Sequence, residues 1–399
     1  MRFWIVNSEL PWHDRTSGGL RLFTLIALLR EAGHHCEYVL STPEAERRRL
    51  GATDYTRYCG DLAAAGVPVL EGIPRRMNGV APDAVIFEWF IVARELLQRF
   101  RWLCPNARLI VDSVDLTYQR WHAKADLSGL PEDRAHAERV EREELDTYAA
   151  ADLVLTLTDE DARELDQRLR GLPSFNVPNI HTLHDVKREE TATPSVLFIG
   201  SFSHQPNVDA VRWFHAEIWP AISRRVPDVQ WMIIGADAPP DILALSDARV
   251  RVLGRVPSTA PWLASAWVSI APLRFGAGMK GKVGEALAAE IPVVTTPFGI
   301  QGYGLVDGES VMVASDAETF ADRVIRLLAD RALRANLAAS GLQTIQNHFS
   351  RHAVAQRIPA LVSAIATAPL RRRNRFPRLV HWSSIVGDWW ARHMGWRFR

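Results

Sequence analysis

The chain has 399 residues, 47% of them hydrophobic, so it can bury more than one core and we expect two domains of roughly 150–200 residues each. Its 47 lysine and arginine residues balance 46 acidic residues, leaving a formal net charge of +1. Such a balance gives no overall attraction to nucleic acid, and no nucleic-acid partner is expected. The odd number of cysteines and their spacing fit a reducing compartment, without a disulfide scaffold. They are Cys36, Cys59 and Cys104.

Short apolar strands alternate with helices through the first half of the chain. The first strand begins almost at the first residue, and its apolar run is too short for a signal sequence or a membrane span. We therefore expect a cytoplasmic protein. The alternation predicts a parallel, doubly wound sheet. The expected strands are Phe3–Val6, Cys36–Leu40, Ala84–Phe87, Leu109–Asp112 and Leu153–Leu157, with helices from about Leu20 to Ala32 and from about Glu132 to Ala150.

A second alternation of strands and helices follows a polar linker at residues 182–194. No G-x-G-x-x-G motif follows the first strand of either half, so a dehydrogenase-type dinucleotide site is not expected. We predict an α/β chain of two Rossmann-like domains, 1–184 and 195–350, facing each other across a cleft, with 351–399 as a C-terminal segment. The expected strands of the second half are Ser195–Gly200, Gln230–Gly235, Val250–Gly254, Val268–Ala271 and Pro292–Thr295, with one helix at Val208–Val226.

The stretch from Pro272 to Thr296 has the order strand end, glycine loop, helix and strand. Its glycines let the backbone approach a ligand closely, and the helix that opens beside them directs unpaired N–H groups toward the same space. The loop glycines are Gly276, Gly278 and Gly281. This layout predicts a diphosphate site. The alternative is an ordinary glycine-rich turn.

Three cations on or beside this loop support an anion site. Only four of the basic residues are lysines, and Lys280 and Lys282 are two of these. Each lysine can act as a compact charge against a leaving diphosphate, while Arg274 can form paired hydrogen bonds to phosphate oxygens. One turn into the helix, Glu285 can accept hydrogen bonds from a sugar diol. The alternative is that these cations are only solvated.

Other loops at the carboxyl ends of expected strands are candidates for the same ligand, because ligands of open α/β sheets bind there. The candidates are Gly200 and Ser201 for phosphate contacts, Arg255 and its backbone for the base, and Gly18 and Gly19 on the opposite wall. For the first two loops the alternative is a plain βα loop. For the loop that precedes Gly18, it is a helix N-cap at Thr16 or Ser17.

Two carboxylates end the strand at Leu109, and we expect both to point toward the mouth of the cleft. They are Asp112 and Asp115, followed by Arg120. We expect Asp115 to orient an acceptor hydroxyl. The histidines show no metal-ligand spacing, so we assign no metal.

The C-terminal segment differs in kind from the domains. Residues 371–378 carry a run of arginines, and four tryptophans follow at 382, 389, 390 and 396. Arginine beside tryptophan suits an anionic membrane surface. The alternative is a helix that packs its tryptophans on the first domain.

Several segments together resemble the family-4 (group 1) glycosyltransferases, which have a GT-B fold. They are Phe198-Ile-Gly-Ser201, Pro206–Phe214, Gly235, Gly254-Arg-Val256 and Lys282–Thr296, and the likeness runs from about Ser195 to Ser350. The resemblance implies transfer of a sugar from a nucleotide diphosphate with retention at the anomeric carbon, without a metal or other cofactor. It also implies a C-terminal helix that returns to the first domain near Phe349.

Carried over by position, Glu285 matches the second glutamate of the family's E-x7-E motif, which binds the ribose hydroxyls. The first glutamate falls on Ala277, so the backbone amides of the loop, from Gly276 through Ala277 and Gly278 to Met279, would contact the donor sugar. Phe202 and His204 stand where the family has a phosphate-binding arginine and lysine.

The resemblance departs in the first domain as well, where the usual histidine–aspartate pair reads Val114-Asp115. The sequence predicts a glycosyltransferase that acts on a polysaccharide or lipid-linked glycan at the inner face of the membrane, with front-face attack by the acceptor. The alternatives are a sugar-nucleotide epimerase or phosphorylase on the same fold, and a catalytically degenerate scaffold protein.

Overall fold

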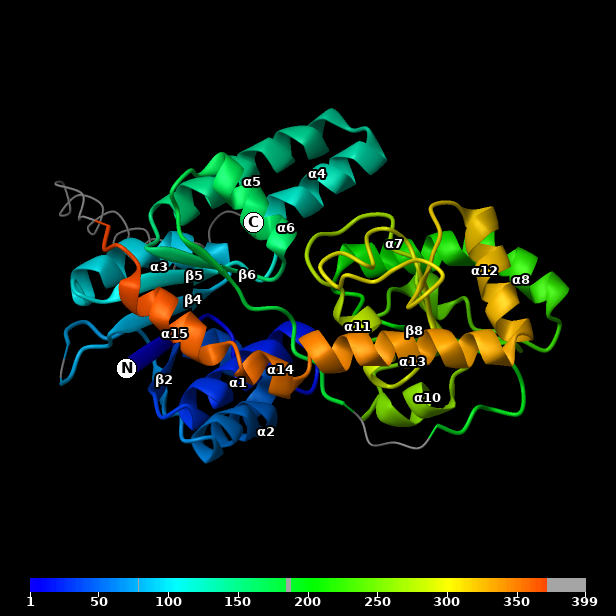
Figure 1. The fold of residues 1–399 in the computed structure, drawn as a ribbon, viewed down its shortest axis with the longest axis horizontal. Coiled ribbons are helices and arrows are strands. Elements are labelled where there is room, and N and C mark those ends of the chain that lie inside the picture. Colours follow the sequence, from blue (N-terminus) through cyan, green and yellow to red (C-terminus); the bar gives the residue numbers. More distant parts are fainter. Residues whose placement is uncertain (78, 184–187, 372–399) are drawn as a thin grey trace.

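The computed structural model describes residues 1–77, 79–183 and 188–371 and contains two β-sheets. Neighbouring strands pair in parallel throughout both sheets. The strand orders are β3-β2-β1-β4-β5-β6-β7 and β10-β9-β8-β11-β12-β13. Figure 1 shows the first domain, blue to cyan, beside the second, green to yellow. The predicted α/β fold with two Rossmann-like sheets is confirmed.

The first sheet contains the five strands predicted from the sequence, with bounds within one residue, and two short edge strands. Its strands are β1 Arg2–Asn7, β2 His35–Leu40, β3 Val69–Glu71, β4 Ala84–Glu88, β5 Arg108–Asp112, β6 Leu153–Thr156 and β7 Ser174–Asn176. The helices between them are α1 Ser17–Glu31, α2 Pro43–Ala64, α3 Phe90–Leu103, α4 Thr117–Ser128, α5 Pro131–Ala149 and α6 Asp159–Arg168.

The second sheet follows the same plan after the linker. Its strands are β8 Ser195–Ile199, β9 Gln230–Ile234, β10 Val250–Gly254, β11 Val268–Ala271, β12 Val293–Thr295 and β13 Met312–Val313. The helices are α7 Gln205–Trp213, α8 Trp219–Arg225, α9 Pro240–Leu243, α10 Ala260–Ser265, α11 Gly281–Ala288, α12 Ala317–Ala329 and α13 Arg331–His348.

Alternate side chains of β1 are buried on opposite faces of the first sheet, so helices cover both faces. Phe3 and Ile5 of β1 belong to the core that α1 and α2 cover, whereas Trp4 and Val6 belong to the core that α3 and α5 cover. Successive side chains of a strand point to opposite faces, so an all-apolar strand needs helices on each side.

One predicted helix is broken. In place of a continuous helix over Val208–Val226, the chain forms α7, a π-helical turn at Phe214–Ile218 and α8. Pro220 near the start of α8 has no amide hydrogen, and its ring would clash with the carbonyl four residues earlier in a regular helix. The wider π turn before Pro220 relieves that clash.

The chain returns to the first domain after α13, as the resemblance implied. Helices α14 Arg351–Ala355 and α15 Ile358–Thr367 place Val354, Ile358 and Leu361 in the core of the first domain. The Arg108 guanidinium donates to the Ala368 carbonyl at 2.6 Å. Figure 1 shows α14 and α15 lying along the first domain. The tail expected to be basic and rich in tryptophan lies at 372–399, outside the described residues.

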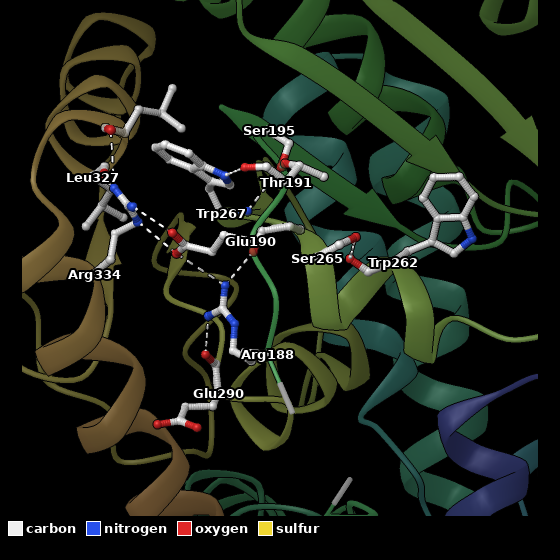
Figure 2. A network of polar contacts seen from close by, with 12 residues as sticks. Arg188, Glu190, Thr191, Ser195, Trp262, Ser265, Trp267, Glu290, Leu327 and Arg334 are labelled. Carbon is white, nitrogen blue, oxygen red and sulfur yellow. Dashed lines mark hydrogen bonds and ion pairs between the residues drawn. The ribbon is translucent and has the colours of Figure 1, made fainter. Parts of the chain in front are cut away.

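The described part of the linker, from residue 188, is bound to the second domain (Figure 2). Arg188 donates to the carbonyls of Glu290 and Ala266, the latter at 2.6 Å. Glu190 accepts two hydrogen bonds from Arg334 of α13, at 3.2 and 3.0 Å. Residues 188–194, predicted as linker, therefore pack as part of the second domain.

Arg334 is the central residue of this contact. Its side chain is 4% exposed, its guanidinium also donates to the Leu327 carbonyl at 2.7 Å, and it lies 4.2 Å from the ring centre of Trp267.

Among the described residues, no helix is long and apolar enough to cross a bilayer.

We expect Arg334→Ala to lower the free energy of unfolding of the second domain by about 3 kcal/mol, because it removes both hydrogen bonds to the Glu190 carboxylate, leaving only Arg188 at 3.6 Å, and leaves a buried carbonyl without its donor. Urea unfolding followed by tryptophan fluorescence measures the change. Arg331→Ala, at an exposed position of the same helix, is the control and should change it by less than about 0.5 kcal/mol. Equal losses in the two variants would contradict the role given to Arg334.

Candidate functional site

The glycine loop connects β11 to α11, and its side chains point into the protein. Phe275, Ala277 and Met279 are buried, and Gly276 and Gly278 between them are buried as well. Gly278 has φ of +63°, a left-handed conformation that strongly favours glycine. The helix begins at Gly281, with Lys280 as its N-cap residue. The predicted order of strand, glycine loop and helix is present.

The first domain packs directly against this loop. A methyl group at Gly281 would lie 2.3 Å from Cβ of Ser17, and one at Gly278 would lie 2.9 Å from Cβ of Asp115. Asn179 of the first domain donates to the Met279 carbonyl at 3.3 Å. The glycines therefore permit close approach of the two domains. The sequence analysis had explained them only by close approach of the backbone to a ligand.

Lys280 lies close to the interface between the domains, because the charges of Asp115 and Asp161 of the first domain act on it. Lys280 Nζ donates to the carbonyls of Ala277 and Gly278, at 2.9 and 2.6 Å, and to Oε1 of Gln301 at 3.1 Å. Burial lowers the pKa of Lys280 to about 8, against the opposing effect of the Asp115 and Asp161 carboxylates. The two carboxylates therefore offset only part of the effect of burial on the pKa of Lys280.

Lys282 faces the loop that follows β8. Its Nζ donates to Oδ1 of Asn207 and lies 4.9 Å from the ring centre of Phe198. A methyl group at Gly200 would lie 2.9 Å from the same Nζ. Burial, and then the charge of Lys280, lowers the pKa of Lys282 to about 7. Near neutral pH, a nearby anion would favour the protonated form of both lysines.

Arg274 is not brought to the lysines. Its guanidinium makes two hydrogen bonds to the carboxylate of Asp209 on α7, one of them at 2.9 Å from Nε. It lines a cavity of about 720 Å³ between the domains, together with Tyr118 and His122 of α4 and Phe298. The phosphate role predicted for Arg274 stays a prediction, and in this structure Asp209 occupies its hydrogen-bonding fork.

The loop that follows β8, predicted to face the ligand, uses part of its backbone for the fold. The Gly200 amide donates to the Ile234 carbonyl of β9 at 2.9 Å, so it does not face the cleft as expected. Ser201 accepts a hydrogen bond from Asn207 at its carbonyl, 2.6 Å away. Beyond the end of β10, Arg255 is exposed.

The first glycine pair caps a helix. The Gly19 amide donates to Oγ1 of Thr16 at 3.1 Å, which is the N-cap alternative. A methyl group at Gly19 would lie 2.6 Å from the backbone nitrogen of Trp12, whereas one at Gly18 would meet nothing within 4 Å. Gly18 is thus the position in this loop with open space beside it.

Asp112 does not point to the cleft mouth, contrary to the prediction. It is fully buried at the end of β5 and pairs with Arg21 of α1 at 2.7 Å. Arg21 is itself fully buried and also binds the Val177 carbonyl at 2.8 Å. A buried guanidinium needs such a partner, so Asp112 holds α1 onto the sheet.

Asp115 lies beside Gly278 and is fixed by its neighbours. Thr117 Oγ1 donates to one carboxylate oxygen at 3.0 Å, and Arg120 donates to the other at 3.2 Å. The preceding Val114 has φ of +58°, a strained conformation for a β-branched residue. This turn directs Asp115 to the loop that carries Lys280.

Glu285 lies one turn into α11 and accepts a hydrogen bond from Oγ1 of Thr259 at 2.7 Å.

The sequence prediction missed the partners of the lysines, Asn207 and Gln301, and it also missed Asp161. The only sequence signal for Asp161 was its position three residues after Thr158, an N-cap pattern that follows the end of β6.

Comparison with known proteins agrees with this geometry. Residues 193–330 match the family model described as Glycosyl transferases group 1. The chain is 31% identical over 123 residues to LpsE of Rhizobium meliloti, a lipopolysaccharide core biosynthesis glycosyltransferase, covering 30% of this chain and 35% of that protein. It is 25% identical over 199 residues to an uncharacterized 44.6 kDa protein in the cps region of Klebsiella pneumoniae, covering 47% of this chain and 50% of that one. The chain thus spans half or less of the length of these curated relatives.

Solved structures match nearly the whole chain in fold. Sucrose-phosphate synthase from Thermosynechococcus elongatus superposes with a TM-score of 0.68 at 15% identity, covering 92% of this chain and 100% of that one. HepE of Anabaena, in complex with UDP and glucose, superposes with a TM-score of 0.66 at 12% identity, covering 91% and 100%. The fold is therefore GT-B, the predicted class, and its second domain carries the group 1 glycosyl transferase match.

We expect Gly281→Ala to lower the free energy of unfolding by about 1–3 kcal/mol, because its methyl group overlaps Ser17. Ser17→Gly removes the overlapping atoms, so the double variant should recover most of the loss in a double-mutant cycle. Gly18→Ala, whose methyl group enters open space, should lose nothing. Chemical denaturation measures the wild type and all four variants. The same loss in the single and double variants would show that the two residues do not meet.

Proposed function

We propose that this protein is a glycosyltransferase that moves a sugar from a nucleotide diphosphate to a hydroxyl group of a glycan. One observation carries the proposal: two lysines with lowered pKa values meet a glycine loop and the start of α11, at the interface of two Rossmann-like domains. Such a place suits a diphosphate, because the helix start and both cations favour negative charge. The group 1 match and the GT-B neighbours support it.

The roles follow from the charge that develops as the glycosidic bond breaks. Negative charge grows on the departing diphosphate, and Lys280, Lys282 and the start of α11 would stabilise it. Glu285, held by Thr259, would accept hydrogen bonds from the ribose hydroxyls, as in the family-4 enzymes. These cations can supply the needed charge, so we propose a reaction without a metal or another cofactor.

We further propose retention at the anomeric carbon, with front-face attack by the acceptor and transfer of its proton to the departing phosphate oxygen. Asp115, fixed beside Gly278 by Thr117 and Arg120, would orient the acceptor hydroxyl. The cavity of about 720 Å³ beside α4 suits a glycan, because carboxylates and a tyrosine line it and can bind sugar hydroxyls.

The relatives suggest the class of acceptor. LpsE is described as an enzyme of lipopolysaccharide core biosynthesis, so we propose a polysaccharide or a lipid-linked glycan as acceptor. We also propose that the protein works in the cytoplasm at the inner face of the membrane, where the basic segment beyond residue 370 would meet anionic lipid.

Nucleotide binding tests the proposal. We expect UDP, GDP or dTDP to raise the melting temperature of the purified protein in a base-selective way, since a ligand at about 100 times its dissociation constant adds roughly 2.7 kcal/mol to the folded state. The affinity should fall from pH 7 to pH 9, because both lysines must be protonated to pair with the diphosphate. Folded protein that responds to none of the three nucleotides would favour the scaffold alternative.

Two substitutions separate the proposed roles. Glu285→Gln should weaken binding of the selected nucleotide by about tenfold, the loss expected for hydrogen bonds to a charged group. Lys280→Met should reduce turnover more than nucleotide affinity, because its charge acts most on the departing diphosphate. Titration calorimetry and a product assay measure the two effects, with Lys124→Met on α4 as control. Equal effects of both substitutions on binding and turnover would reject this division.

A further inference from the structure

A second cavity, of about 300 Å³, lies between the domains beside the glycine loop. From the first domain, Asp161 at the start of α6 and Gln119 of α4 line it. From the second domain, Gly278 of the glycine loop and Gln301 line it. The cavity is thus small, built from both domains, and rich in groups that bind hydroxyls.

One oxygen of the Asp161 carboxylate lacks a hydrogen-bond partner. The residue is 3% exposed, and its Oδ2 has no hydrogen-bond partner among the described residues. Burial raises the pKa of its carboxyl group to about 6; a side-chain hydrogen bond with Thr158 opposes this rise, the nearby charge of Asp115 adds to it, and Lys280 opposes it. A buried, unpaired acceptor costs stability. A ligand that donates hydrogen bonds would remove that cost.

The cavity continues to the atoms that would meet the diphosphate. Gln301 lines it and accepts a hydrogen bond from Lys280 Nζ at 3.1 Å. Gly278, which also lines the cavity, follows Ala277, the position that lacks a carboxylate. Ile300 and Leu305 also line the cavity, and they give it an apolar wall that suits the C–H face of a sugar ring.

We propose that this cavity holds the transferred sugar and that Asp161 accepts hydrogen bonds from its hydroxyl groups, supplying from the first domain the carboxylate that position 277 lacks. The inference deepens the proposed function and rests on it. Gln301 and Gln119 contribute further hydroxyl contacts. Because Asp161 and Gln301 belong to different domains, the sugar would be held only when both domains face each other as they do here.

The test compares each nucleotide sugar with its own nucleotide. UDP-glucose and UDP, GDP-mannose and GDP, and dTDP-glucose and dTDP are titrated calorimetrically into the wild type, Asp161→Asn and Asp159→Asn. Asp159 is exposed in the same first turn of α6, so its variant controls for the loss of one charge at the helix start. We expect the wild type to bind one sugar form about tenfold or more tightly than its nucleotide.

In Asp161→Asn, that tenfold preference should fall to within about twofold, with the affinity for the free nucleotide unchanged, and Asp159→Asn should match the wild type. An unchanged preference would overturn the donor assignment. If KM for the glycan acceptor then rises, the cavity binds an acceptor sugar instead. Failure of every nucleotide to bind would reject the proposed function itself, a result distinct from binding of nucleotide without a preference for its sugar.

Stability gives a second readout that needs no ligand. The pKa of Asp161 is raised in the folded protein, so ionisation of this carboxyl destabilises the fold as the pH rises through about 6. Asp161→Asn should therefore raise the melting temperature at pH 7.5 and change it little at pH 4. A melting temperature lowered at pH 7.5 would show that Asp161 is a structural residue, and would overturn the inference.

Discussion

The contact between the glycine loop and the first domain is the constraint on which the site depends. Gly278 and Gly281 leave no room for a side chain next to Asp115 and Ser17, so the loop backbone and the first domain meet directly. Lys280 lies between the two glycines, and burial lowers its pKa to about 8. The loop carbonyls that bind Lys280 Nζ are then fixed by the same packing. The glycines that permit close approach of the domains therefore also help to fix the position of the Lys280 charge.

Burial changes how this site carries charge. A surface lysine keeps its proton throughout the neutral range, but desolvation brings the pKa values of Lys280 and Lys282 to about 8 and about 7. Near neutral pH, part of the charge on these two lysines is therefore lost, and an arriving anion would favour the protonated form of each. Arg274 differs from the lysines because its guanidinium is already paired with the Asp209 carboxylate.

The sequence was sufficient to predict the longer strands of both sheets, because a short, mainly apolar run bounded by turn residues has few other solutions. It missed β3, β7 and β13, which lie at sheet edges and are two or three residues long, too short for a pattern. In the site, the glycine loop and its lysines were found from local spacing. Asp112 was misplaced because its partner, Arg21, is 91 residues away, and Asp161 was missed because its cavity forms only when two domains meet.

The two crossings of the chain between the domains converge on the same loop. His181, before the linker, donates its amide to the Phe349 carbonyl after α13 at 2.8 Å. Its ring contacts the Tyr303 hydroxyl at 2.9 Å, and that hydroxyl donates to the Lys280 carbonyl at 3.1 Å. A methyl group at Gly284 of α11 would lie 2.1 Å from the His181 ring. Burial lowers the pKa of His181 to about 4, so the ring stays neutral and serves as a hydrogen-bonding spacer. Any rotation of one domain about these crossings must therefore also move the start of α11, where the lysines lie.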